Sequence, residues 1–159
     1  MKLKVFRLRP EAKLPHRAHP TDAGCDVFYC RRGDDIFTSD SIDDRGNIIV
    51  YPNTTCLIPT GIKVEFASNH MLEVKNKSGI ASKKNLVVGA CVIDHLYDGE
   101  VYINLHNVGK VPRIIEPGQK VAQVVLVPIS TCEVEEVFED NLNQGTARSE
   151  GGFGSTGDF

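Results

Sequence analysis

The chain has 159 residues, of which 41% are hydrophobic and 25% are charged. This length and composition predict a single globular domain with a sizeable core. The formal net charge of −3 argues against a broad nucleic-acid-binding surface, so a phosphate-bearing ligand would need a local cluster of cations.

The cysteines and the N-terminus indicate the compartment. Five cysteines are spread along the chain without a CxxC pair or a Cys/His spacing typical of zinc. The N-terminal residues lack the apolar stretch of a signal peptide, and no later apolar run is long enough for a membrane helix. We therefore expect free thiols, a reducing cytoplasmic compartment, no membrane association and no nucleic-acid partner.

Short apolar runs separated by Gly, Pro and Asn predict many short strands and little helix. The segments with this pattern are, in chain order, 3–8, 48–51, 58–66 with a turn at 59–61, 71–74, 86–88, 92–93, 101–105, 121–127 and a charged edge segment at 134–137. Only 80–85 could form a turn or two of helix. The pattern favours an all-β sandwich, jelly roll or barrel.

Residues 31–47 interrupt this series of strands with a polar, charged and apolar-poor sequence, RRGDDIFTSDSIDDRGN. We expect a long surface loop or hairpin excursion there. Such an acidic surface could contact a protein partner, whose nature the sequence does not indicate.

Segment 88–107 carries the first candidate chemistry. Asp94 follows an apolar strand, and Tyr97 lies just before a second strand, which predicts a β-hairpin with a carboxylate at the end of its first strand. A carboxylate anchored there could act as a general base for water. The alternative, which this segment alone favours, is a turn aspartate that bonds local backbone N–H groups beside a packed tyrosine.

Three further segments are ambiguous when each is taken alone. In 75–85, Lys77 and Ser78 could bind phosphates, although a solvated basic loop is the better interpretation, since the segment is not a Walker loop. Asp26 could lie beside a metal, although a turn carboxylate is favoured. Gln123 lies inside an apolar strand and therefore needs a hydrogen-bond partner, either structural or a ligand.

The C-terminal segment GGFGSTG, residues 151–157, cannot support a core. It could close over a ligand, with the ring of Phe153 on a flat base and backbone N–H groups and hydroxyls on phosphate. Arg148, just upstream, adds a permanent cation suited to phosphate. The alternative is a disordered Gly/Ser tail.

Taken in order along the chain, these segments resemble a known family. DAGCD, NKSGIA, VIDHLYDGE, GQKVAQVVLVP and RSEGGFGSTG are similar to the five motifs of the trimeric dUTP pyrophosphatases, the dUTPases. The resemblance implies a jelly-roll-like β-barrel over residues 1–143 and a mobile tail, 144–159, that closes over an active site. It also implies a homotrimer with active sites between subunits.

The activity implied is hydrolysis of dUTP to dUMP and pyrophosphate with the help of Mg²⁺, which limits uracil in DNA and supplies dUMP for dTMP synthesis. By the same resemblance, Asp94 would activate the water that attacks the α-phosphorus, and Tyr97 would stack under the deoxyribose. Backbone groups would pair with uracil; these belong to Cys91, Val92, Ile93 and Tyr102.

The resemblance also implies how the phosphates are held. Lys77, Ser78, Gly79 and Gln123 would meet the phosphates, and Asp26 would hold Mg²⁺ through its water shell. On the tail, Arg148 and the run Gly154, Ser155 and Thr156 would bind the γ-phosphate end, while Phe153 would cover the uracil.

Three positions depart from the family pattern. Lys77 stands where arginine is usual, which keeps the charge but loses the two-pronged bond and predicts weaker phosphate clamping. Cys91 and Ser149 each replace a frequent glycine. None of these changes removes the proposed base, the sugar-stacking tyrosine or the tail aromatic.

Two other functions are weighed against the dUTPase interpretation. A dCTP deaminase shares the fold, but its usual Arg-Ser-Ser second motif and its lack of a GGFGSTG tail both differ from this chain. A nucleotide-dependent regulator could use loop 31–47 as a contact surface, although a pure binder would be expected to have lost Asp94 or Tyr97.

Overall fold

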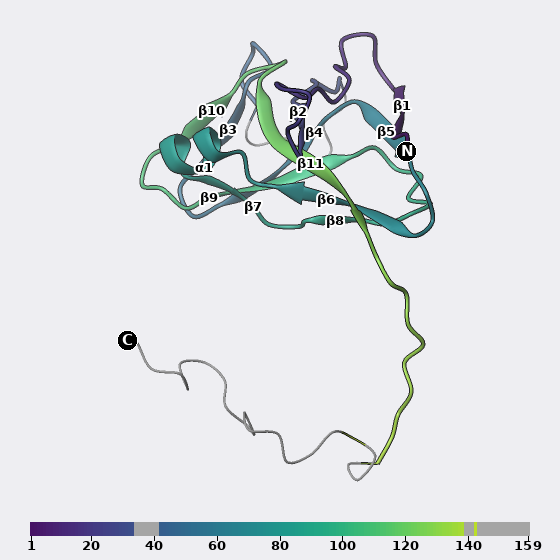
Figure 1. The fold of residues 1–159 in the computed structure, drawn as a ribbon. Helices are drawn as coiled ribbons and strands as arrows, with labels where there is room; N and C mark the ends of the chain where they lie inside the picture. Colours follow the sequence, from purple (N-terminus) through teal and green to yellow (C-terminus); the bar gives the residue numbers. More distant parts are fainter. Residues whose placement is uncertain (34–41, 139–141, 143–159) are drawn as a thin grey trace.

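The computed structural model of the chain describes residues 1–33, 42–138 and 142, whose regular elements are short strands and one short helix joined by turns and loops (Figure 1). The elements are, in chain order, β1 (Lys4–Arg7), β2 (Cys25–Phe28), β3 (Ile48–Val50), β4 (Thr55–Pro59), β5 (Ile62–Glu65), β6 (His70–Lys75), α1 (Ser78–Lys84), β7 (Leu86–Val88), β8 (Val92–Ile93), β9 (Tyr102–Asn107), β10 (Arg113–Ile115) and β11 (Lys120–Pro128). The expected all-β, jelly-roll-like fold is therefore confirmed.

The strands pair antiparallel in four small sheets. A four-stranded sheet has the order β2-β11-β6-β8 and a three-stranded sheet the order β4-β9-β7, while β1 pairs with β5 and β10 pairs with β3. Most neighbours are distant in sequence, so each sheet is assembled from separate parts of the chain.

The core is built by alternation, which the sequence predicts best for β9. Ile103 and Leu105 are buried, whereas Asn104 and His106, which alternate with them, are half-buried. Ile103 lies opposite Ile58 and Leu105 opposite Cys56, so the inward faces of β4 and β9 pack on each other. Burying each such aliphatic side chain stabilises the fold by roughly 1.5–3 kcal/mol.

The predicted turn at 59–61 is present between β4 and β5, and it needs glycine. Gly61 has φ +72°, and a Cβ there would lie 2.8 Å from both the Ala12 Cβ and the Cys30 Sγ. A side chain would meet both a left-handed backbone and a filled space.

The structure corrects two expectations about strands and adds one strand that was not expected. Residues 129–138 form no strand; they run away from the sheets beyond β11 (Figure 1), with Val134 96% exposed. The predicted hairpin around Asp94 is wrong, because β8 pairs with β6 whereas β9 pairs with β4 and β7. Strand β10, which the sequence reading missed, is a three-residue strand beside β3.

Part of the polar segment 31–47 can be described. Ile42 bridges Ile48, and the Asp43 side chain accepts hydrogen bonds from the backbone N–H groups of Arg45 and Asn47, so 42–47 is a tight turn. The hydroxyl of Tyr29 donates to the Gly46 carbonyl at 2.7 Å and fixes this turn to the core. Residues 34–41 lie outside the described residues.

The short helix lies close to its predicted place, over Ser78–Lys84 rather than 80–85. It ends at Asn85, whose left-handed backbone donates its N–H to the last turn of the helix. No helix in the described part of the chain is long and apolar enough to cross a membrane. All five cysteines are free.

Candidate active site

One pocket brings together five of the residues singled out in the sequence. Its volume, about 320 Å³, is within the size range of small-ligand sites. Its lining consists of Val92, Ile93, Asp94, Tyr97, Val101 and Tyr102. Asp94 follows β8 directly, and its side chain is exposed. Among the described residues, the Asp94 carboxylate makes no hydrogen bond or ion pair, so it is available to a ligand or a water.

A tight turn after Asp94 sets the tyrosine. The Tyr97 N–H donates to the Asp94 carbonyl at 3.2 Å, and the Tyr97 hydroxyl donates to the Glu100 carbonyl at 3.0 Å. Leu96, which lies between Asp94 and Tyr97 in the chain, has φ +68°, a left-handed conformation that makes the turn sharp. A Cβ on Gly99 would lie 2.2 Å from the tyrosine oxygen, so the ring folds back over that glycine.

The backbone beside the pocket belongs to a sheet edge. Among the strands that the structure describes, β8 pairs on one side only, with β6, through Val92 opposite Glu73 and Ile93 opposite Leu72. The Cys91 carbonyl accepts the Val74 N–H at 2.7 Å, so this group is already used within the sheet. The other side of an edge strand presents backbone donors and acceptors, which a flat polar base can meet.

A second group of predicted residues gathers around Asp26 on β2. The Lys77 Nζ lies 2.7 Å from Asp26 Oδ1, and the Lys120 Nζ lies 2.7 Å from Oδ2. The Asp26 side chain is only 6% exposed, whereas the two lysine side chains reach the surface. Asp26 is therefore a strand residue with two ion-pair partners and not the turn carboxylate that the sequence favoured.

A β-bulge places Lys120 in this group. Gln123 lies opposite Asp26, but the register between β11 and β2 shifts between Lys120 and Ala122, so that Lys120 and not Val121 lies opposite Phe28. Because side chains alternate along a strand, this one-residue shift moves Lys120 to the face that carries Asp26 and Gln123.

The charge on Asp26 follows from these partners. Burial favours the protonated carboxyl, but the ammonium groups of Lys120 and Lys77 favour the carboxylate more strongly, so the pKa of Asp26 lies below its usual value. At neutral pH the three groups carry one negative and two positive charges. The surface beside β2 and α1 is thus locally cationic on a chain of net negative charge.

Gln123 has a structural partner and a tightly fitted neighbour. Its Nε2 donates to the Asn76 carbonyl at 2.9 Å. A Cβ on Gly24 would lie 2.3 Å from Gln123 Oε1, so the glycine of the DAGCD segment leaves room for this amide. Ser78 and Gly79 open α1 next to Lys77, and both are exposed. We call the polar group on this surface the lysine cluster; its members are Asp26, Lys77, Ser78, Gly79, Lys120 and Gln123.

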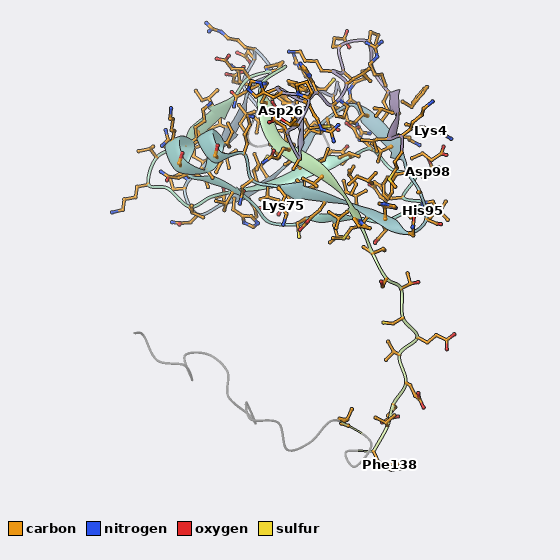
Figure 2. The ribbon with its side chains drawn as sticks, viewed as in Figure 1. Lys4, Asp26, Lys75, His95, Asp98 and Phe138 are labelled. Atoms are coloured by element: carbon orange, nitrogen blue, oxygen red, sulfur yellow. The ribbon has the colours of Figure 1, made fainter. Side chains whose placement is uncertain are left out.

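The pocket and the lysine cluster do not meet within one chain. In the order β2-β11-β6-β8, Asp26 and the strand before Asp94 lie at opposite edges of one sheet. Three strand spacings separate them, about 14 Å. In Figure 2 Asp26 lies apart from His95 and Asp98, the neighbours of Asp94.

Asp26, expected to hold Mg²⁺ through water, is paired with two lysines in this arrangement. Both of its oxygens face an ammonium group at 2.7 Å, and the described residues contain no group of three or more His, Cys, Asp or Glu side chains that could hold a metal ion. Mg²⁺ takes oxygen ligands, commonly one or two carboxylates together with substrate phosphates. The expectation that Asp26 holds Mg²⁺ through water therefore stays a prediction.

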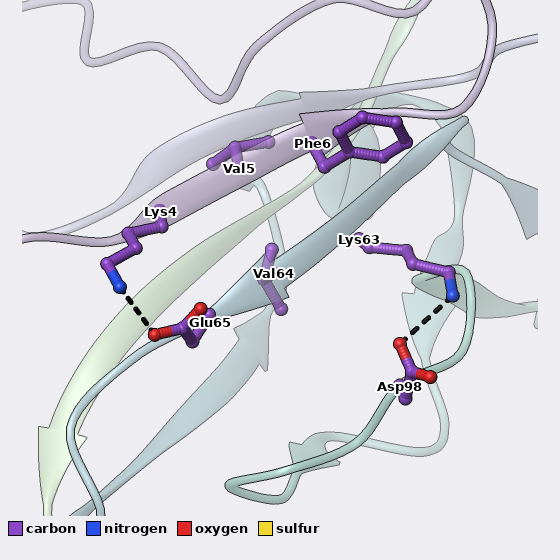
Figure 3. A pocket seen from close by; sticks show the side chains of 7 residues that line it. All are labelled: Lys4, Val5, Phe6, Lys63, Val64, Glu65 and Asp98. Carbon is purple, nitrogen blue, oxygen red and sulfur yellow. Dashed lines mark hydrogen bonds and ion pairs between the residues drawn. The ribbon is translucent and has the colours of Figure 1, made fainter.

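Another pocket, of about 280 Å³, lies between β1 and β5 and contains none of the predicted site residues (Figure 3). Its charged side chains are paired with one another, Lys4 with Glu65 at 2.6 Å and Lys63 with Asp98 at 3.0 Å. We therefore do not assign it to the active site.

The tail residues expected to contact the ligand lie outside the described residues: Arg148, Phe153, Gly154, Ser155 and Thr156. Conversely, the structure adds Lys120, which sequence reasoning missed. The only available signal was its position between a turn glycine and an apolar strand, and the bulge that turns it toward Asp26 cannot be recognised from that.

The fold and the pocket with its carboxylate define a β protein with a candidate polar site at a sheet edge. Comparison with known proteins identifies the class. The dUTPase family model matches residues 42–157. The chain belongs to the dUTPase family, as the order of its motifs had indicated.

Relatives from bacteria support this over the whole chain. The deoxyuridine 5'-triphosphate nucleotidohydrolase of Hydrogenobaculum sp. (strain Y04AAS1) is 36% identical over 159 residues, which cover 99% of each chain. The protein of the same name from Clostridium tetani is 37% identical and covers 98% of this chain and 96% of its own.

Solved structures of phage enzymes share the fold. A mutant dUTPase of Staphylococcus bacteriophage 80alpha with dUpNHpp is similar with a TM-score of 0.77, 26% identity and 98% coverage of both chains. A mutant dUTPase from phage phi11 of S. aureus, in which a structural Mg(II) ion is coordinated, is similar with a TM-score of 0.72 and 26% identity, covering 87% of this chain and 99% of that chain.

Proposed function

We propose that this chain hydrolyses dUTP to dUMP and pyrophosphate. The observation that carries the proposal is the sheet-edge pocket lined by Tyr97 and by Asp94, whose carboxylate has no partner among the described residues. A general base, a flat surface for a sugar and backbone groups for a base are the parts that a nucleotide hydrolase of this kind needs.

Asp94 is the proposed general base. Its carboxylate accepts a proton from a water, which attacks the α-phosphorus in line with the departing pyrophosphate. Its position directly after β8 gives it a rigid anchor, while its exposed side chain leaves room for that water.

Tyr97 and the backbone of 91–93 and Tyr102 are proposed to bind the deoxynucleoside. The tyrosine ring, fixed by its hydrogen bond to the Glu100 carbonyl, lies under the sugar and leaves no room for a 2′-hydroxyl. Backbone groups of the edge strand pair with uracil and reject cytosine, because an amino group in place of a carbonyl leaves donors facing donors.

The lysine cluster is proposed to bind the triphosphate, with Lys77, Ser78, Gly79 and Gln123 as contacts. Because this cluster lies across the sheet from Asp94, a complete site needs the pocket of one copy and the cluster of another. That requirement supports the proposed homotrimer, and the extended segment 129–138, directed away from the sheets, is suited to reach a neighbouring copy. Mg²⁺ stays a prediction on which no step here depends.

The test of the base is Asp94→Asn, which keeps the shape and removes the proton acceptor. We expect pyrophosphate release from dUTP to fall by about 10²–10⁴-fold while dUpNHpp still binds. Parallel assays with dCTP, dTTP and UTP test selectivity, and ammonia from dCTP would favour a deaminase. Undiminished turnover by Asp94→Asn would remove Asp94 from its role.

The proposed lid is tested by truncation after Asn143. If 144–159 closes over the site and completes the phosphate shell, the shortened chain should fold and assemble like the full chain, yet hydrolyse dUTP far more slowly. Circular dichroism and light scattering control for folding and assembly. Full activity of the truncated protein would contradict the lid.

A further inference from the structure

A largely buried ion pair joins Arg9 to Glu100, the residue before the pocket residue Val101, and was not expected from the sequence. The Arg9 guanidinium binds both oxygens of the Glu100 carboxylate, with Nη1 3.0 Å from Oε2. The Glu100 side chain is 7% exposed and the Arg9 side chain 19% exposed. The same carboxylate accepts the Gly61 N–H at 2.7 Å, so Glu100 is held by three hydrogen bonds.

This pair ties the pocket to two distant parts of the chain. Arg9 follows β1, and its guanidinium also lies 3.5 Å from the Cys30 Sγ. Next to Glu100, the Val101 N–H donates to the Ile62 carbonyl, and the Thr60 hydroxyl donates to the Val101 carbonyl at 2.6 Å. The backbone at 100–101 therefore has a fixed position relative to the β4–β5 turn.

The fixed backbone is the one that holds Tyr97. The Glu100 carbonyl accepts the Tyr97 hydroxyl, and Val101 itself lines the pocket. Tyr97 is 46% exposed, so packing alone restrains its ring weakly. The orientation of the ring then depends on where the Glu100 carbonyl lies.

We infer that Glu100, clamped by Arg9, is a positioning residue that sets the Tyr97 ring and thereby the discrimination between deoxyribose and ribose. This inference rests on the proposed function. A buried ion pair contributes little net stability compared with apolar residues of the same size, but a two-pronged pair fixes geometry closely. Misplacement of a binding group by about 1 Å is enough to cost roughly 10²-fold in rate.

The experiment uses Glu100→Gln, which keeps the shape and removes the charge, and Arg9→Lys, which keeps the charge and loses the two-pronged bond. The matched control is Glu65→Gln, which removes the exposed Lys4–Glu65 pair (Figure 3), whose side chains are 69% and 65% exposed. For each protein, kcat and KM are measured with dUTP and with UTP. Tyrosine-labelled NMR of the ligand-free protein follows the four tyrosine rings, with Tyr97 assigned by Tyr97→Phe.

We expect the ratio of kcat/KM for dUTP over UTP to fall by about tenfold or more in Glu100→Gln, less in Arg9→Lys and not at all in Glu65→Gln. The Tyr97 ring signals should shift only in the first two variants. A folded Glu100→Gln with the original ratio and unshifted Tyr97 signals overturns the inference. If Glu100→Gln does not fold, the same two readouts on Arg9→Lys decide.

The two proposals fail separately. If the unaltered protein released no pyrophosphate from dUTP, the proposed function would be wrong, yet the Tyr97 signals would still decide whether Glu100 positions the ring. If dUTP were hydrolysed but the ratio and the signals ignored Glu100, only the positioning role would be lost.

Discussion

Gly24→Ala is a small change whose effect should be confined to Gln123. A Cβ at this position would lie 2.3 Å from Gln123 Oε1 and 2.9 Å from its Cδ. Since both atoms belong to a flexible side chain, the amide should rotate away and give up its hydrogen bond to the Asn76 carbonyl. A hydrogen bond of this kind contributes about 0.5–1.5 kcal/mol to stability, so the fold should survive.

The effect on catalysis should be larger than the effect on stability. If Gln123 donates to a phosphate oxygen, the lost bond involves a charged group and amounts to about 1.5–3 kcal/mol, which corresponds to roughly 10- to 150-fold in kcat/KM. The assay is steady-state pyrophosphate release from dUTP, alongside chemical denaturation. Gly33→Ala is the control, because among the described residues no atom beyond its chain neighbours lies within 4 Å of its added Cβ.

A double-mutant cycle isolates the cause. In a Gln123→Ala background the clashing atoms are gone, so Gly24→Ala should add no further loss of kcat/KM. The reasoning is refuted if Gly24→Ala alone keeps normal kinetics, or if its loss is the same with and without the Gln123 side chain.

Two further predictions concern stability. Because the pKa of Asp26 is lowered in the folded protein, its charge stabilises the fold above about pH 4, the usual unfolded value, and this contribution is lost as the pH falls through the folded pKa. The free energy of unfolding should therefore exceed that of Asp26→Asn at pH 7, with the difference shrinking in acid, and a constant difference would argue against the ion pairs. Gly61→Ala should lower the free energy of unfolding by about 1–2 kcal/mol for its left-handed backbone and by about 1–3 kcal/mol more for crowding. Gly118→Ala has a similar φ, +79°, but its added Cβ lies near the movable Lys13 side chain, so it should lose the backbone contribution alone. Equal losses in denaturation would contradict this difference.

Some residues of the candidate site could be predicted from the sequence, and others could not. Five of the residues expected at the nucleoside site line one pocket, because they are close together in the sequence; Cys91 is not in its lining, and Phe153 lies outside the described residues. Lys120 and the Arg9–Glu100 pair were not predictable, because their partners are 94 and 91 positions away along the chain.

The sequence by itself determined the strand-rich character of the chain, the turn at Gly61, the short helix and the order of motifs that indicates its family. These depend on alternation, turn chemistry and residue identity, which are local properties. Only the tertiary structure decided which strands pair. It separated the strands around Asp94 into two sheets, turned Lys120 onto Asp26 through a bulge, and placed Asp26 and Asp94 at opposite edges of one sheet. The reason is physical: a strand's pattern specifies which face is buried, whereas its partner is chosen by packing among segments far apart in the chain.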